Sequence, residues 1–257
     1  QTLENDQGYM KAQKEYDVAT SKTWYYIGQC ASTFELYSLA VQAFDSSLRH
    51  VPDSVESLVG LSKSLKLQDP KIGLKQSTEL LLSSLQRYPH LANEPQVFKE
   101  LCETHLASNQ YEEAHQAISR ALTLSSNDPE LLLVGAECLI KLSNFQYATH
   151  TLHSVLSFFA SRPHLNEHEV DIVRKAHCKI ACLASLENNL KVAVSEMQAA
   201  LALPPQSPSR IEDQATLWAV LITLKERGGD IDGALRVSQD AIKSLGSIPK
   251  LLIAQAY

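Results

Sequence analysis

Residues 24–52 read WYYIGQCASTFELYSLAVQAFDSSLRHVP. Apolar and small residues recur at helical spacing in both halves of this stretch: Trp24, Ile27, Gly28 and Ala31 in the first, and Ala40, Phe44 and Ser47 in the second. Two antiparallel helices approach closely where side chains are small, as at Gly28 and Ala40, and larger ones such as Phe44 fill the space around the contact. Pro52 cannot continue the second helix, so it ends the unit. The stretch therefore predicts two packed helices joined by a turn.

The same pattern recurs along the chain, as it does in repeat proteins. The small residues that mark the second helix of each unit are Ala40, Ser77, Ala114, Ala148, Ala193 and Ala234. The intervals between them are 37, 37, 34, 45 and 41 residues, so several units are lengthened. Turns within the units are expected at Asp69-Pro70 (a lengthened turn), Asn109-Gln110-Tyr111, Ser143-Asn144-Phe145, Asn188-Asn189-Leu190 and Gly229-Asp230-Ile231.

This pattern of an aromatic residue, Ile-Gly, a small residue, then Ala, an aromatic residue, a small residue and Pro resembles the tetratricopeptide repeat (TPR). The resemblance implies an all-α TPR superhelical solenoid of about six helix–turn–helix repeats, several of them lengthened or degenerate. The TPR array is expected over 21–247, with repeats at about 21–54, 55–90, 95–128, 129–162, 174–207 and 215–247. Residues 1–20 are expected to form a leading helical or flexible segment, and 248–257 a capping helix or a truncated further repeat.

Two further features concern an interruption of the repeats and the ends of the chain. Around residues 162–173, Pro163 and the run Asn166-Glu167-His168-Glu169 predict a broken turn before a lengthened helix. The chain also begins at Gln1 without a methionine and stops at Tyr257 inside a helical pattern. We therefore expect it to be a fragment of a longer protein.

Composition narrows the class of protein. Hydrophobic residues make up 44% of the 257 residues and charged residues 20%, which is too apolar for a disordered chain. Lys and Arg (23) are outnumbered by Asp and Glu (29), so direct nucleic-acid binding is not expected. No apolar run is long enough to predict a membrane span. The five cysteines are an odd number at irregular spacing, which favours reduced thiols and a cytoplasmic or nuclear location.

The sequence contains no motif of a catalytic site. A Gly-rich phosphate loop, a G-x-S-x-G elbow and an H-E-x-x-H helix are all missing from it. His164 and His168 could form a metal pair, and His177 with Cys178 and Cys182 could bind zinc. A solvated insertion loop and packing thiols are the favoured interpretations of these two groups. We predict no enzymatic activity, no metal site and no cofactor.

The TPR resemblance implies that the first helix of each repeat lines a concave surface, which takes an extended peptide or a partner helix. Aromatic residues at repeat-core positions are expected to be buried: Trp24, Phe44, Phe98, Phe145 and Trp218. Tyr25 is the leading candidate for a partner-facing aromatic residue. The predicted partner-binding residues are Lys22, Tyr25, Gln29, Lys63, Lys99, Glu103, Glu137 and Lys175. Neither charge sign dominates, so a partner helix or a segment of mixed polarity is expected.

One TPR class holds the acidic tail of heat-shock chaperones through a carboxylate clamp of Lys, Asn and Arg side chains. The residues that stand at the clamp positions here are Tyr25, Gln29, Val59, Gln96 and Glu100. A chaperone tail bound through such a clamp is therefore not expected.

The opening repeats also resemble the TPR subunit of the fungal general transcriptional corepressor. The shared positions are Thr23-Trp24, Ile27, Ala43-Phe44-Asp45, Leu48, Pro52 and Ser54. From Lys66 onward the repeats here are longer and more degenerate than in that family. The resemblance implies a nuclear adaptor between DNA-bound repressors and a β-propeller co-subunit.

These features together predict a non-enzymatic scaffold or adaptor subunit of a multiprotein complex, which binds partner segments on the concave TPR surface. Lengthened, degenerate repeats favour this interpretation because irregular loops and helices offer several binding surfaces. Two alternatives remain open: a dedicated chaperone or transport adaptor for one client peptide, and a transcriptional corepressor adaptor.

Overall fold

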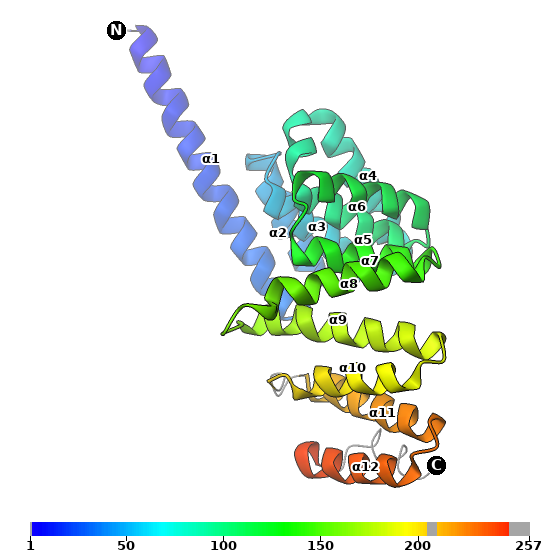
Figure 1. The fold of residues 1–257 in the computed structure, drawn as a ribbon. Helices are drawn as coiled ribbons and strands as arrows, with labels where there is room; N and C mark the ends of the chain where they lie inside the picture. The colour runs from blue at the N-terminus through cyan, green and yellow to red at the C-terminus, as the bar shows by residue number, and fades with distance from the viewer. Residues whose placement is uncertain (1, 205–209, 247–257) are drawn as a thin grey trace. The chain divides into compact units, whose positions relative to one another are not determined.

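The computed structural model describes residues 2–204 and 210–246. Within these ranges the regular structure is helical and contains no strand, which confirms the all-α prediction. The helices are α1 (Thr2–Thr33), α2 (Tyr37–His50), α3 (Val55–Gln68), α4 (Pro70–Arg87), the 3-10 helix η1 (Pro89–Asn93), α5 (Pro95–Ala107), α6 (Tyr111–Leu124), α7 (Pro129–Lys141), α8 (Phe145–Ala160), α9 (Glu167–Leu186), α10 (Leu190–Ala202), α11 (Ile211–Arg227) and α12 (Ile231–Leu245) (Figure 1). The chain divides into two compact units, Gln1–Val134 (unit 1) and Gly135–Tyr257 (unit 2).

Five of the turns inside helix pairs are built alike. One residue in each has left-handed backbone geometry: Glu35, Asn109, Ser143 and Asn188 with φ 59°, and Gly229 with φ 78°. The next residue donates its N–H to a carbonyl five residues earlier, as from Leu36 to Ala31 (2.8 Å) and from Asn189 to Ala184 (2.8 Å). This bonding closes the end of a helix in the Schellman manner. The turns that were predicted at residues 109, 143, 188 and 229 are confirmed.

The turn between α3 and α4 is different. Only Asp69 separates the two helices, and its carboxylate accepts the N–H groups of Lys71 (3.0 Å) and Ile72 (3.2 Å). Pro70 occupies the first position of α4, where its missing N–H costs nothing. The expectation of a lengthened turn at Asp69-Pro70 is therefore wrong, because a capped, proline-initiated helix needs no loop.

The insertion before α9 also resolves into a helix start. The Asn166 side chain accepts the N–H of Glu169 (2.9 Å), and the Glu169 carboxylate accepts the N–H of Asn166 (3.0 Å). This reciprocal pair is a capping box, so α9 begins at Glu167, ahead of the expected repeat start at 174. The first repeat likewise begins early, since α1 runs without a break from the leading segment into the expected first-repeat helix. The expected element at 248–257 lies outside the described residues.

One hydrophobic cluster of unit 1 is formed around Phe44 of α2. Its buried ring lies between α1 and α3, where a Cβ atom on Gly28 would be 2.8 Å from the ring and one on Gly60 would be 2.6 Å from it. This close contact turns Gly28 and Ala31 of α1 inward. Ile27, which the repeat pattern groups with Gly28 and Ala31, is 39% exposed.

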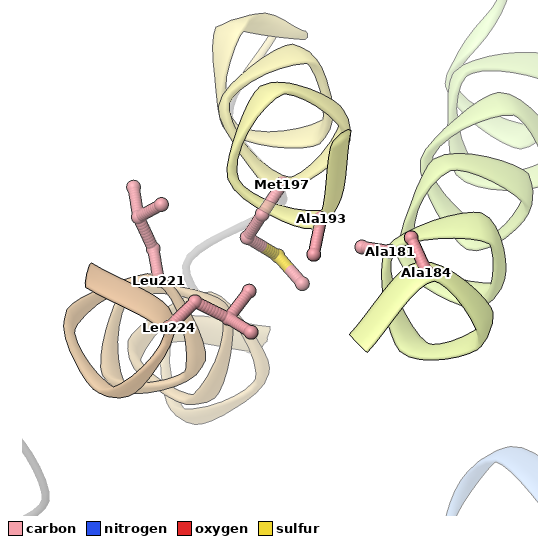
Figure 2. Packing of buried hydrophobic residues seen from close by; sticks show 6 residues of the cluster. All are labelled: Ala181, Ala184, Ala193, Met197, Leu221 and Leu224. Atoms are coloured by element: carbon pink, nitrogen blue, oxygen red, sulfur yellow. The ribbon is translucent and has the colours of Figure 1, made fainter. Parts of the chain in front are cut away.

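Four other aromatic residues were predicted to be buried, and the structure shows them only half-buried: Trp24, Phe98, Phe145 and Trp218. In unit 2, small residues again allow close packing, with Ala181 and Ala184 of α9 facing Ala193 of α10. Figure 2 shows Met197 of α10 directed toward Leu224 of α11, so one long side chain joins α10 to the next helix pair. None of the helices in the described part is long and apolar enough to cross a membrane.

Candidate functional site

A groove lies between α1 and α3 in unit 1, with a volume of about 280 Å³. Its lining residues are Val18, Ser21, Lys22, Tyr25, Tyr26, Val51, Ser54, Glu56 and Ser57. We call it the α1–α3 groove. Two of the predicted partner-binding residues, Lys22 and Tyr25, line it, and Gln29 donates a hydrogen bond to the Tyr25 hydroxyl (2.5 Å). Three predicted residues, all on α1, therefore lie in this groove or directly beside it.

Tyr25 is half-buried and links the groove to the core. Its ring centroid lies 5.9 Å from that of Phe44 and 5.5 Å from that of Tyr26. Burial raises the pKa of the Tyr25 hydroxyl, and the nearby Glu56 carboxylate raises it further. The hydroxyl therefore stays protonated and can donate to a ligand acceptor. Tyr26, which sequence reasoning did not select, is 60% exposed and adds a second aromatic wall.

The base of the α1–α3 groove is held by three buried serines from three helices. The Ser47 hydroxyl of α2 lies 2.9 Å from that of Ser21 and 2.7 Å from that of Ser57. Ser54 caps α3 by accepting the N–H of Ser57 (3.4 Å). Because these hydroxyl groups bond one another, they satisfy the buried polar atoms and fix the spacing of α1 and α3. The groove walls are thus positioned before any ligand binds.

A second group of predicted residues lies on α3 and α5. Lys63 is exposed, whereas the Lys99 ammonium is paired with the Glu130 carboxylate of α7. Burial raises the pKa of Glu103; Glu100 raises it further, and Lys99 and Lys63 oppose the shift. Of this group, Lys63 is the side chain best placed to reach a partner.

Glu100, on the same helix as Lys99 and Glu103, is buried between α3, α4 and α5. Its carboxylate accepts hydrogen bonds from the Ser62 hydroxyl (2.5 Å) and the Lys66 ammonium (2.7 Å). Ser62 is also 2.5 Å from Ser77, and Lys66 donates to Thr104 (3.3 Å). Glu100 stands at one of the clamp positions considered above, and here it is part of the packing between repeats rather than of a surface.

The two remaining predicted residues lie in unit 2 and are both in ion pairs. Glu137 of α7 accepts from Lys179 of α9 (3.0 Å), and Lys175 lies 3.6 Å from the Asp171 carboxylate. Lys175 and Lys179 line a second hollow of about 280 Å³ between α9 and α11. Sequence reasoning missed Arg174 and Arg210 in this hollow, although Asp171, Arg174 and Lys175 stand at one-turn spacing on α9.

Three histidines and two cysteines were considered as metal ligands. No cluster of three or more His, Cys, Asp or Glu side chains suited to a metal occurs in residues 2–204 and 210–246. His164 lies in the exposed turn before α9, and His168 lies in the first turn of that helix. His177 is bonded instead to Glu196 (2.7 Å).

Cys178 is expected to react slowly with alkylating reagents. Burial raises the pKa of its thiol to about 11, and the neighbouring Cys182 adds to the shift. Since only the thiolate reacts, its rate at pH 8 is expected to be on the order of a hundredfold below that of an ordinary cysteine, and to rise as the pH approaches 11. Iodoacetamide labelling read by peptide mass spectrometry tests this, with the exposed Cys30 and Cys182 as internal references. Equal rates at Cys178 and Cys182 in the folded chain would contradict it.

No protein-family model and no curated protein sequence matches the chain. Solved structures do match it. A chain of the APC/C hetero-tetramer Cut9–Hcn1 is 12% identical with a TM-score of 0.68, over 92% of this chain and 42% of that one. PilW, described as a widely conserved type IV pilus biogenesis factor, is 13% identical with a TM-score of 0.68, over 91% and 97% of the two chains. This chain thus spans less than half of the Cut9–Hcn1 chain.

A third neighbour is TTC0263, a thermophilic TPR protein of Thermus thermophilus. It is 17% identical with a TM-score of 0.58, over 77% of this chain and 98% of that one. At such identities the likeness concerns the fold alone. The helix pairs are closed by recurrent turns, small residues lie at the helix contacts, and the similar solved structures have the same architecture. The chain therefore has the all-α fold of the tetratricopeptide-repeat proteins.

Proposed function

We propose that this chain is a non-enzymatic scaffold or adaptor subunit of a multiprotein complex. The partner segment is held on the face made by the first helices of the repeats. The TPR fold supports protein interaction in general, and one neighbour belongs to the hetero-tetramer named above. The α1–α3 groove is the observation that carries the proposal for this chain, because it combines fixed walls with exposed aromatic and charged groups.

The chemistry of the α1–α3 groove suits a segment of mixed polarity. Tyr25 and Tyr26 offer rings on which an apolar side chain can pack. Within the described ranges Lys22 forms no ion pair, and Glu56 accepts only a long hydrogen bond from Ser54 (3.3 Å). One positive and one negative group are therefore available to pair with opposite charges of a partner, which would fix the register of the bound segment.

A photo-crosslinking experiment tests the proposed face. The photoreactive residue p-benzoylphenylalanine replaces Tyr26, and in a matched variant it replaces Tyr147 of α8, a second helix of its repeat. The two tyrosines are similarly exposed, at 60% and 68%. We expect protein crosslinks in native extract from position 26 at several times the yield from position 147. An excess of unlabelled chain should compete them away, and an excess of the Tyr25→Ala, Lys63→Glu variant should not.

The crosslinked products separate the possible roles. Several folded proteins captured at position 26 would support a scaffold, whereas a single short client would favour a dedicated chaperone or transport adaptor. Crosslinks at position 147 with none at position 26 would overturn the assignment of the first-helix face. Equal competition by the double variant would remove Tyr25 and Lys63 from the binding surface.

A further inference from the structure

The hollow between α9 and α11 in unit 2 has a charged lining around an apolar floor. Its residues are Asp171, Arg174, Lys175, Cys178, Lys179, Arg210, Asp213 and Leu217. Four of these side chains are cationic and two are anionic. Leu217 and the protonated Cys178 provide apolar surface beside them. We call this hollow the α9–α11 pocket.

Arg174 is a buried cation at this pocket, with its side chain only 7% exposed. Its guanidinium donates to the Pro204 carbonyl, and it lies 3.5 Å from an Asp171 oxygen, which is long for a hydrogen bond. Burial lowers the pKa of Arg174, and this effect outweighs the opposing effect of Asp171. A guanidinium has five N–H donors, and a buried charge is costly unless it is well paired. Arg174 therefore gains from a further anionic acceptor in the pocket.

Asp171 alone does not neutralise the pocket. Its carboxylate bonds closely to Arg210 (2.6 Å) and lies further from Arg174 and Lys175 (3.6 Å). Arg210 takes a second acid, Asp213 (3.1 Å), and Lys179 pairs with Glu137 outside the pocket lining. Even when Glu137 is counted, cations exceed anions. The surplus positive charge lies with Arg174 and Lys175.

We propose that the α9–α11 pocket is a subsite for an acidic side chain of the partner segment, whose carboxylate is received by Arg174 and Lys175. This inference rests on the proposed function and names one chemical feature of the partner. The apolar floor suits the methylene groups of a glutamate, and the guanidinium suits the planar carboxylate. A doubly charged phosphate fits less well, because Asp171 and Asp213 would repel it.

The test uses the purified chain and small probes, so it does not need the natural partner. The side-chain Nε–H signals of Arg174 and Arg210 are followed by ¹⁵N NMR while N-acetyl-glutamate methylamide is added. N-acetyl-glutamine methylamide and inorganic phosphate are added in separate titrations. We expect saturable shifts with the acid at millimolar concentration, no saturable shift with the amide and weaker binding of phosphate. Arg174 is left in place because its burial makes a folding defect the expected result of replacing it.

The variants locate the binding. Lys175→Gln is expected to weaken binding of the acid by about tenfold, the loss of one charge-assisted contact. Lys191→Gln, on an exposed part of α10 in the same unit, is the matched control and should change nothing. Equal shifts with acid and amide, tighter binding of phosphate, or unchanged affinity in Lys175→Gln would each overturn the proposal.

The outcome is separable from that of the crosslinking experiment. Loss of crosslinks at position 26 with normal acid binding would count against the proposed function alone. Normal crosslinks without acid binding would remove only the subsite. If the acid binds but Lys175→Gln leaves capture of the crosslinked partner unchanged, the pocket is not the partner's anchor and the proposal falls.

Discussion

Replacing Phe44 with alanine is expected to lower the free energy of unfolding of unit 1 by about 3–5 kcal/mol, the usual cost of removing a buried aromatic side chain. Phe44 is 2% exposed, and its ring fills the space between Gly28 of α1 and Gly60 of α3. The substitution would therefore leave a cavity between α1, α2 and α3 and remove the packing contacts that hold these helices together. Urea unfolding followed by Trp24 fluorescence measures the effect, with Trp218→Phe as the background so that only unit 1 is reported.

Phe34→Ala is the matched control for this prediction. Phe34 is 75% exposed in the turn between α1 and α2, so the same substitution there should change the stability by less than about 0.5 kcal/mol. Gly60→Ala should also be destabilising, because its new Cβ would meet the Phe44 ring at 2.6 Å. It should be better tolerated once Phe44 is alanine, since the clash is then gone. Independent, additive effects of the two changes would contradict the close contact between Gly60 and the Phe44 ring.

The repeat pattern was readable from the sequence because it rests on local chemistry. Small residues such as Ala114 and Ala148 recur where helices must approach, and both are buried. The turns at Asn109 and Gly229 were readable because Asn and Gly tolerate left-handed backbone geometry. Glu35 and Ser143 adopt the same geometry against their residue preference. The bonding of the whole turn thus decides the conformation there, and side-chain identity does not.

The orientation of the first helix could not be read in the same way. Trp24, Tyr25 and Tyr26 are consecutive aromatic residues, so helical spacing alone allows more than one inward face. In the structure Phe44 selects the face that contains Gly28, and Ile27 is left at the surface. That choice depends on a ring from another helix. A helical sequence pattern predicts which residues share a face of the helix, but it does not predict which face packs against a neighbouring helix.

The candidate binding surface was predictable only in part for a related reason. Lys99 and Glu137 were selected as single charged residues, and both are in ion pairs with the next first helix. The pairs join residues 31 and 42 positions apart, and these intervals vary with the lengthened loops. Arg210 reaches Asp171 across 39 positions in the same way. Because the repeats differ in length, the sequence alone did not predict which charged residues would meet in the α9–α11 pocket.

Replacing Lys66 with methionine is expected to destabilise unit 1 by about 3–5 kcal/mol, because it removes one partner of a buried ion pair. Glu100 is 1% exposed, and Lys66 is the cation bonded to it, at 2.7 Å. Without Lys66 the carboxylate would keep the Ser62 hydroxyl but lose its counter-charge. The unfolding measurement that uses Trp24 fluorescence again reports the change. Lys75→Met is the control, since Lys75 and Glu79 form an exposed pair at 3.9 Å that should contribute little.

The double variant Lys66→Met, Glu100→Leu separates two explanations of that loss. If the cost comes from a carboxylate left buried without a cation, removing the carboxylate as well should restore most of the stability, because apolar replacements of buried ion pairs are often neutral. If it comes from lost packing of the lysine stem between α3 and α5, the double variant should remain as unstable as Lys66→Met. The Ser62 hydroxyl donates to Glu100 and is also hydrogen-bonded to the Ser77 hydroxyl (2.5 Å each), which favours the first outcome. These bonds indicate that the network is built around the Glu100 carboxylate. The double variant should therefore regain only part of the lost stability, because hydroxyl groups of the network then lack an acceptor.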